Sequence, residues 1–270
     1  MSGMGLGRSL LEIEPCRYGY SQLAFRGPEA DLDRPYIAYL GTTETVGPFL
    51  TRPFPYLVSE ALGLGCANLG VKNAGPDVFL NDPELLRVAQ GAEAVVLEVM
   101  GAANQSNAFY RVHPRRNDRF TRAHEALFDL APGLDTTDIH YTGHLMEEVA
   151  RVAPKRVGEV IVALQEAWIT RMRRLVSVIG VPVHVVRFTT HMERTRFVEP
   201  TMLAALASCA ATVTRITPSD EAMAQGTEDM FFLKSEVRAA RSMLSAAAHY
   251  EAADTLVEVL RPGIETAHTG

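Results

Sequence analysis

The sequence has little cysteine, no long apolar run and no excess of basic charge. Its three cysteines, Cys16, Cys66 and Cys209, are far apart and fit no zinc-binding spacing, so we expect reduced thiols. No run approaches the roughly 18 apolar residues that a membrane span needs. Residues 1–16 are glycine-rich and lack the continuous apolar segment of a signal peptide. These absences favour a soluble, cytoplasmic protein with no membrane span.

The charge balance argues against a polyanionic partner. The 270 residues carry 32 acidic and 26 basic side chains, a net charge of −6, so we expect no nucleic-acid partner. The chain also has no GxxxxGK[ST] loop and no GxGxxG motif after a strand, and we expect no cofactor. Apolar side chains, by contrast, make up 47% of the residues, which is enough to bury the core of a folded protein.

Short apolar runs that end near glycines alternate with helical patterns along the chain. Strands are expected at residues 36–40, 66–69, 94–100, 181–188 and 211–216. Helices are expected at residues 53–62 and 83–90, from Val157 to a stop at Gly180, and between 239 and 260, where Pro262 and Gly263 close the last one. Because strand–helix–strand units of this rhythm form parallel sheets, the sequence predicts a three-layer α/β/α sandwich. It would have about five parallel strands, with residues 36–40 as a central one.

The length, just above that of one compact domain, predicts a single folded unit with two short extensions. Residues 1–34 are rich in glycine, proline and charge and have little periodicity, so they are interpreted as an N-terminal arm. Residues 35–262 form the predicted α/β domain, and residues 263–270 the C-terminal tail.

Three of the predicted strands run into unusually polar loops. They are residues 41–45, 68–77 and 101–107, which combine glycine with threonine, asparagine, lysine and acidic side chains. Open parallel sheets bind ligands outside the carboxyl ends of their strands, so these loops are the expected place for a site. Each loop taken alone is also explained by helix capping and tight turns.

In their order and spacing these loops resemble the motif blocks of the GDSL/SGNH hydrolase superfamily. Residues 40–43 (Leu-Gly-Thr-Thr) match the first block, residues 68–70 (Asn-Leu-Gly) with 75–77 (Gly-Pro-Asp) the second, residues 101–104 the third, and residues 249–253 the last. The resemblance implies a flavodoxin-like or SGNH-like strand order. Through residues 52–55 and 113–118 the whole chain also looks like an uncharacterised bacterial domain family related to that superfamily.

The resemblance implies catalytic roles for five residues. Thr43 would be the nucleophile and His249 the base, while the Gly75 region, Asn73 and Asn104 would stabilise the oxyanion. The chain departs from the family in four ways. The nucleophile is threonine instead of serine, Asn73 aligns with the oxyanion glycine, Asn104 is displaced by one residue, and Ala246 replaces the orienting aspartate. Thr43 as a turn residue and His249 as a helix-surface residue remain open alternatives.

Further polar residues are predicted to bind substrate. Thr42 and Glu44 flank Thr43 in the first loop. The stretch from Arg111 to Arg122 holds five arginines against one acid, and guanidinium groups suit carboxylate, sulfate or phosphate. Within this stretch the expected substrate contacts are Arg111, Arg115, Arg116 and Asn117. We expect these guanidinium groups to converge beside Thr43 and Asn104; the alternative is a solvated surface paired with the protein's own acids.

A second polar cluster is better explained by helix capping and solvated carboxylates than by metal binding. Asp138, His140 and His144 offer ligands together with Glu147 and Glu148, but the segment is turn-like and nothing aligns both histidines, so no metal is expected.

The sequence therefore predicts an SGNH-like hydrolase or O-acyltransferase acting on an acyl ester, such as that of a carbohydrate. The alternative is a catalytically inactive SGNH-like domain that binds an anionic ligand or a protein partner. The expected partner is a small molecule or glycan, with a homo-oligomer left open.

Overall fold

The computed structural model describes residues 11, 13–189 and 197–269. Its elements in chain order are β1 (Pro15–Cys16), β2 (Phe25–Arg26), β3 (Tyr36–Leu40), α1 (Thr43–Val46), α2 (Phe54–Leu62), β4 (Gly65–Asn68), α3 (Pro76–Leu80), α4 (Pro83–Gln90), β5 (Ala94–Glu98), β6 (Tyr110–His113), β7 (Arg116–Ala123), α5 (Glu125–Leu130), α6 (Thr142–Val152), α7 (Val157–Ile179), β8 (Val183–Phe188), α8 (Pro200–Ala204), β9 (Thr212–Ile216), α9 (Asp220–Ala224), the short 3-10 helix η1 (Lys234–Glu236), α10 (Val237–Ala240) and α11 (Ala246–Thr269).

Five parallel strands form the central sheet in the order β4-β3-β5-β8-β9, which confirms the predicted fold class. Strand β3 lies inside the sheet: Ala38 pairs with Ala67 of β4 on one side and with Val95 of β5 on the other. All residues of β3 and β5 are buried, as their continuous apolar sequences indicate for strands covered on both faces. From β3 the chain passes to β4 on one side, and then returns to β5 on the other side. The place between β3 and β5 is therefore the topological switch point of the sheet.

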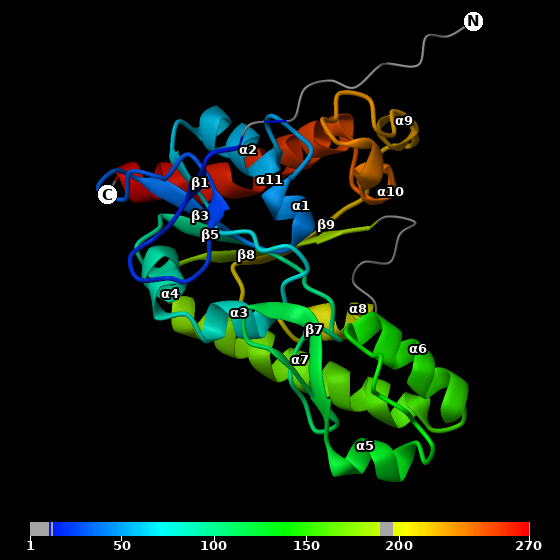
Figure 1. Cartoon of the computed structure of the whole chain (residues 1–270). Helices are drawn as coiled ribbons and strands as arrows, with labels where there is room; N and C mark the ends of the chain where they lie inside the picture. The colour runs from blue at the N-terminus through cyan, green and yellow to red at the C-terminus, as the bar shows by residue number, and fades with distance from the viewer. Residues whose placement is uncertain (1–10, 12, 190–196, 270) are drawn as a thin grey trace, which may run out of the picture.

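Helices cover both faces of the sheet (Figure 1). On one face α2 and α11 bury residues such as Phe54 and Leu256 against the side chains of Ile37 and Val96. On the other face α3, α4 and α7 form the larger core, centred on residues such as Trp168. Figure 1 shows the hairpin β6–β7 with α5 and α6 extending from this second face, beside the first half of α7. No helix among the described residues is long and apolar enough to cross a membrane.

The last helix extends past the expected stop at Pro262. Proline lacks an N–H and crowds the preceding turn, so it normally ends or kinks a helix. Here α11 runs from Ala246 to Thr269 with Pro262 inside it. Leu260 and Ile264, on either side of the proline, both pack into the core under α2, and this burial offsets the lost hydrogen bond. Residues 263–269 are thus part of the helix and not a separate tail.

The described part of the predicted N-terminal arm packs against the domain. Strands β1 and β2 pair as an antiparallel hairpin, and the Tyr18 and Phe25 side chains enter the larger core. Arg26 is 7% exposed, and its guanidinium donates hydrogen bonds to four main-chain oxygens at the end of α1 and in the segment that leads to α2. These carbonyls are those of Val46, Gly47, Leu50 and Thr51. Sequence patterning missed this because the apolar side chains here have neither helical nor strand spacing.

Candidate functional site

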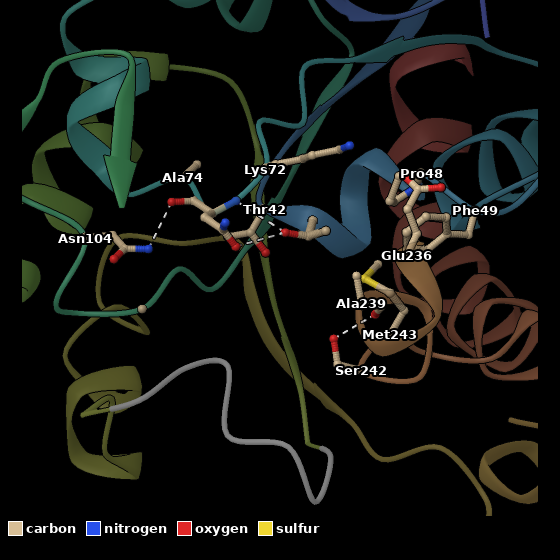
Figure 2. Close-up of a pocket in the computed structure, with 13 residues that line it drawn as sticks. Thr42, Pro48, Phe49, Lys72, Ala74, Asn104, Glu236, Ala239, Ser242 and Met243 are labelled. Carbon is tan, nitrogen blue, oxygen red and sulfur yellow. Dashed lines mark hydrogen bonds between the residues drawn. The ribbon is translucent and has the colours of Figure 1, made fainter. Parts of the chain in front are cut away.

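A cavity of about 580 Å³ lies at the carboxyl ends of β3, β4 and β5, the switch point of the sheet (Figure 2). Its described lining comprises Thr42, Thr43, Pro48, Phe49, Lys72, Asn73, Ala74, Gly101, Asn104, Glu236, Ala239, Ser242 and Met243. The three polar loops predicted from the sequence therefore meet here. They supply one wall of the cavity, and residues 236–243 with Pro48 and Phe49 supply the other.

The loop after β3 is held by a buried carboxylate that the sequence analysis missed. Glu98, the last residue of β5, is 4% exposed and accepts hydrogen bonds from the main-chain N–H of Thr42 at 2.7 Å and of Thr45 at 3.0 Å. It also accepts from both threonine hydroxyls, that of Thr45 at 2.6 Å. Burial raises the pKa of Glu98 above its ordinary value, although the hydrogen bonds oppose this. A Cβ at Gly41 would overlap the Thr45 and Glu98 side chains, so glycine is required there.

Thr43 contacts Asn73 of the loop after β4. The Thr43 hydroxyl accepts a hydrogen bond from the Asn73 main-chain N–H at 3.3 Å and donates to the Asn73 Oδ1 at 3.4 Å. Asn73 has a left-handed backbone, with φ of 55°, a conformation that asparagine tolerates better than most residues. Its side-chain nitrogen donates to Asp118 of β7 at 3.2 Å, which fixes the amide orientation.

Asn104 completes the polar wall from the loop after β5. Its Nδ2 donates to the Asn73 carbonyl oxygen at 2.9 Å, and its Oδ1 accepts from the Thr142 hydroxyl of α6 at 2.7 Å. The structure thus brings together Thr43, Asn73 and Asn104, as the resemblance implied. It does so through direct contacts between three loops that lie 30 residues or more apart in the chain.

Gly75 and Asn117 have structural roles outside the described lining of this cavity. The Gly75 N–H donates to Asn117 Oδ1 at 3.0 Å, so it is not available to an oxyanion. The same oxygen accepts from the Val78 N–H at 3.1 Å, and the Asn117 amide donates to the His113 and Pro114 carbonyls. Wholly buried, Asn117 joins the start of α3 to the β6–β7 hairpin and is not placed to contact a ligand of this cavity.

His249 does not meet Thr43. Its ring is wholly buried in the first turns of α11, stacked on Phe54 with ring centroids 5.8 Å apart. Its Nδ1 accepts a hydrogen bond from the Phe54 N–H at 3.0 Å, so in the neutral ring the proton is on Nε2. That nitrogen lies 3.6 Å from Glu44 Oε2. Glu44 is itself only 4% exposed, and the same oxygen accepts from the Leu244 N–H.

The expected Thr43–His249 dyad is therefore not formed among the described residues. The side chain of a helical residue points outward on the face of the helix where that residue lies. Because α11 packs against α2, the face that carries His249 is turned into the core. Glu44, expected to contact substrate, points the same way, toward His249.

The arginines of the β6–β7 stretch do not converge on this cavity within the described lining. Arg111 lines a second cavity with Arg171 and Arg174 of α7, and Arg115 lines a groove against residues 20–23. Arg116 is exposed on β7. The register of the hairpin explains this divergence, because its side chains alternate between two faces and a bulge lies between Arg111 and His113.

The two walls of the cavity differ in chemistry. Figure 2 shows Thr42, Lys72 and Asn104 on the side of the strand-end loops, opposite Phe49, Ala239 and Met243. Phe49 and Met243 belong to one small apolar cluster, whose edge faces the cavity. Glu236 and Ser242 add polar groups at this second wall. Among the described residues, no group of three or more His, Cys, Asp or Glu side chains is arranged to hold a metal ion.

The fold and the cavity define an α/β protein with a five-stranded parallel sheet and a ligand-sized cavity at its switch point. A family model described as Domain of unknown function (DUF6473) matches residues 1–264, so the chain belongs to this family. A comparison with curated proteins found no match, and neither did a comparison with solved structures.

Proposed function

We propose that the chain is an SGNH-like domain that binds an O-acyl ester of a carbohydrate or similar polyol in the cavity at the ends of β3, β4 and β5. The observation that carries the proposal is the pairing of a hydroxyl- and amide-rich wall with an apolar one across about 580 Å³. Hydroxyl and amide groups suit the ester carbonyl and the sugar hydroxyls, while Phe49, Ala239 and Met243 suit the acyl chain.

Binding without turnover is favoured by the surroundings of Thr43. A threonine hydroxyl needs a base within hydrogen-bond reach to act as a nucleophile. His249 is buried, with Nδ1 engaged by Phe54 and Nε2 facing Glu44. The described lining contains Lys72 and Glu236 as titratable groups, and no hydrogen bond joins either to Thr43.

Hydrolase or O-acyltransferase activity is the second candidate, favoured by the contacts among Thr43, Asn73 and Asn104. The Asn104 amide has a second hydrogen beyond the one donated to the Asn73 carbonyl, and an amide donor beside a hydroxyl can stabilise an oxyanion formed by attack at a carbonyl. In this reaction Thr43 Oγ1 would bond to the ester carbonyl carbon as the bond to the alcohol breaks and the hydroxyl proton leaves with that alcohol. Water, or the hydroxyl of a second alcohol, would then take the acyl group and restore the threonine.

Calorimetric titration with 6-O-octanoylglucose, below its micelle concentration, tests the binding proposal. Ala239 is exposed and lines the apolar wall, so Ala239→Trp should fill the acyl site and weaken binding by about tenfold or more. Its neighbour Arg238 is exposed outside the described lining, and Arg238→Trp is the matched control. Absence of saturable binding, or equal losses in both variants, would overturn the proposal.

The same proteins assayed with p-nitrophenyl butyrate separate binding from turnover. Wild type is expected to bind the acyl sugar without hydrolysing the chromogenic ester above background. Hydrolysis by wild type that disappears in Thr43→Val, a variant of nearly the same shape without the hydroxyl, would establish the second candidate instead.

A further inference from the structure

A second cavity has a volume of about 450 Å³. It is formed by α3, the β6–β7 hairpin, the segment after β5 and the second half of α7. Its described lining is Asp77, Leu80, Asn81, Ser106, Arg111, Val112, Pro114, Asn117, Arg171 and Arg174. None of these residues lines the first cavity, so the two are separate sites.

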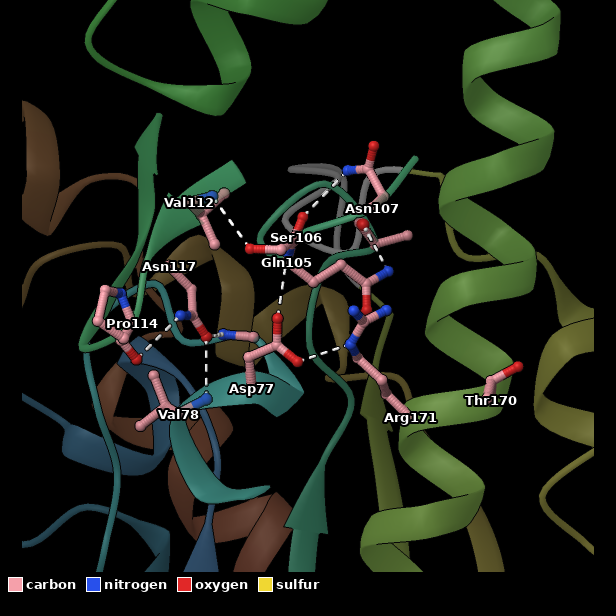
Figure 3. Close-up of polar contacts among 12 residues, drawn as sticks. Asp77, Val78, Gln105, Ser106, Asn107, Val112, Pro114, Asn117, Thr170 and Arg171 are labelled. Atoms are coloured by element: carbon pink, nitrogen blue, oxygen red, sulfur yellow. Dashed lines mark hydrogen bonds and ion pairs between the residues drawn. The ribbon is translucent and has the colours of Figure 1, made fainter. Parts of the chain in front are cut away.

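Arg171 is held in place at the floor of this second cavity. Its Nε lies 2.6 Å from Asp77 Oδ1, and the side chains of Arg171 and Asp77 are 27% and 13% exposed. The other carboxylate oxygen accepts from the Ser106 N–H at 3.1 Å, and Figure 3 shows Asp77 between these two partners. Asp77 engages the Nε, and no hydrogen bond joins the two terminal nitrogens of this guanidinium to another described residue. The Arg171 guanidinium is therefore held in a fixed, partly desolvated position, with its terminal nitrogens available to an anion.

Arg111 and Arg174 add positive charge that the protein itself does not balance here. Arg174 lies one helical turn from Arg171 on the same face of α7, and Arg111 reaches the cavity from the hairpin. Within the described parts of the chain, neither arginine has a carboxylate within ion-pair distance, and Asp77 is the acid of the described lining. Three guanidinium groups with one carboxylate repel one another, and a bound anion would relieve that repulsion.

We propose that this second cavity binds the phosphate or sulfate group of a small molecule. Guanidinium forks match the oxygens of phosphate, sulfate and carboxylate. Three forks from two elements suit a tetrahedral group, which presents oxygens in several directions, better than a carboxylate, which presents two in one plane. The Ser106 hydroxyl lines the cavity as well; its oxygen already accepts from the Val112 N–H, which leaves its proton to donate to an anion.

Isothermal titration with sodium phosphate, at an ionic strength held constant with sodium chloride, tests the site in the full chain. Arg111→Ala and Arg174→Ala should each weaken phosphate binding by about tenfold or more, since each removes a charge-assisted contact. The controls are Arg173→Ala on α7 and Arg116→Ala on β7, which remove the same charge from exposed positions outside the described lining. We expect these to change affinity by less than about twofold.

The arginines replaced in the two site variants and the two control variants are all exposed, so these substitutions should leave the far-ultraviolet circular dichroism unchanged. Titrations with sulfate and acetate identify the ligand chemistry: sulfate should compete with phosphate, and acetate should bind at least about tenfold more weakly. The proposal is overturned if wild type shows no saturable phosphate binding. It is also overturned if the controls lose as much affinity as the site variants, or if acetate binds as tightly as phosphate.

Discussion

Replacing Glu98 tests how far one buried carboxylate holds the candidate site together. Its side chain accepts four hydrogen bonds, two from Thr42 and two from Thr45, and so fixes the loop on which Thr43 stands. Glu98→Ala would leave the N–H and the hydroxyl of the buried Thr45 without an acceptor. At about 1–3 kcal/mol for each unsatisfied buried group, the free energy of unfolding should fall by about 3 kcal/mol.

Glu98→Gln should cost much less. The amide oxygen can take the position of Oε2, which accepts three of the four hydrogen bonds. The amide nitrogen then faces the Thr42 hydroxyl, which can turn and accept instead of donating. We expect a loss of about 1 kcal/mol or less at neutral pH. Urea denaturation followed through Trp168, the one tryptophan of the chain, measures both variants, because its indole is wholly buried in the folded state.

The pH dependence gives an independent check on Glu98. Because burial raises its pKa in the folded state above 4.5, the folded protein binds this proton more tightly than the unfolded chain. The resulting stabilisation is fully present below the unfolded pKa and is lost as pH rises through the folded one. The stability of wild type relative to Glu98→Gln should therefore fall as pH rises from about 4. A relative stability that rises over this interval, or an alanine variant as stable as the glutamine variant, would refute the reasoning.

Two further substitutions, one of them with a matched control, test the packing around the first cavity. Gly75→Ala should lower the free energy of unfolding by about 1–3 kcal/mol, because the new Cβ would overlap the Asn104 carbonyl oxygen. The control is Gly158→Ala in α7, where a Cβ would meet no atom within 4 Å. In the same urea titration this variant should be as stable as wild type or more stable. Arg26→Met should cost about 3 kcal/mol by leaving buried carbonyls without a donor, and a change below about 0.5 kcal/mol in thermal or urea unfolding would show that the N-terminal hairpin is dispensable.

Local pattern was sufficient for the sheet. The inner strands β3 and β5 are nearly continuous apolar runs that are followed by turn residues, and the predicted residues 36–40 coincide with β3. The loops that follow β3, β4 and β5 could be expected to meet because parallel strands end on one edge. The last helix was misjudged at Pro262, where burial of Ile264 from beyond the proline decides the outcome and no local signal reports it.

The parts of the site that depend on contacts between residues far apart in the chain could not be predicted from the sequence. Glu98 stands in an apolar run and binds residues more than 50 positions earlier, so only its unusual charge could have drawn attention to it. His249 lies at the expected place in the chain, but the face that it presents is set by α11 packing on α2. Arg111 lines one cavity with Arg171 and Arg174, which lie some sixty residues further along the chain. The arginines close to Arg111 in the sequence therefore did not indicate which other arginines it would meet.

The segment between β5 and α7, residues 99–156, secures the polar wall of the first cavity. Asp118 of β7 holds the Asn73 side chain, Thr142 of α6 holds Asn104, and Asn117 of β7 holds the Gly75 N–H. A site supported by such outer contacts keeps its groups oriented before a ligand arrives, which lowers the entropy that binding costs. Since Arg111 of the β6–β7 hairpin lines the second cavity, this one segment shapes both candidate sites. The loops of the sheet place the polar groups, and the segment between β5 and α7 fixes the direction in which they point.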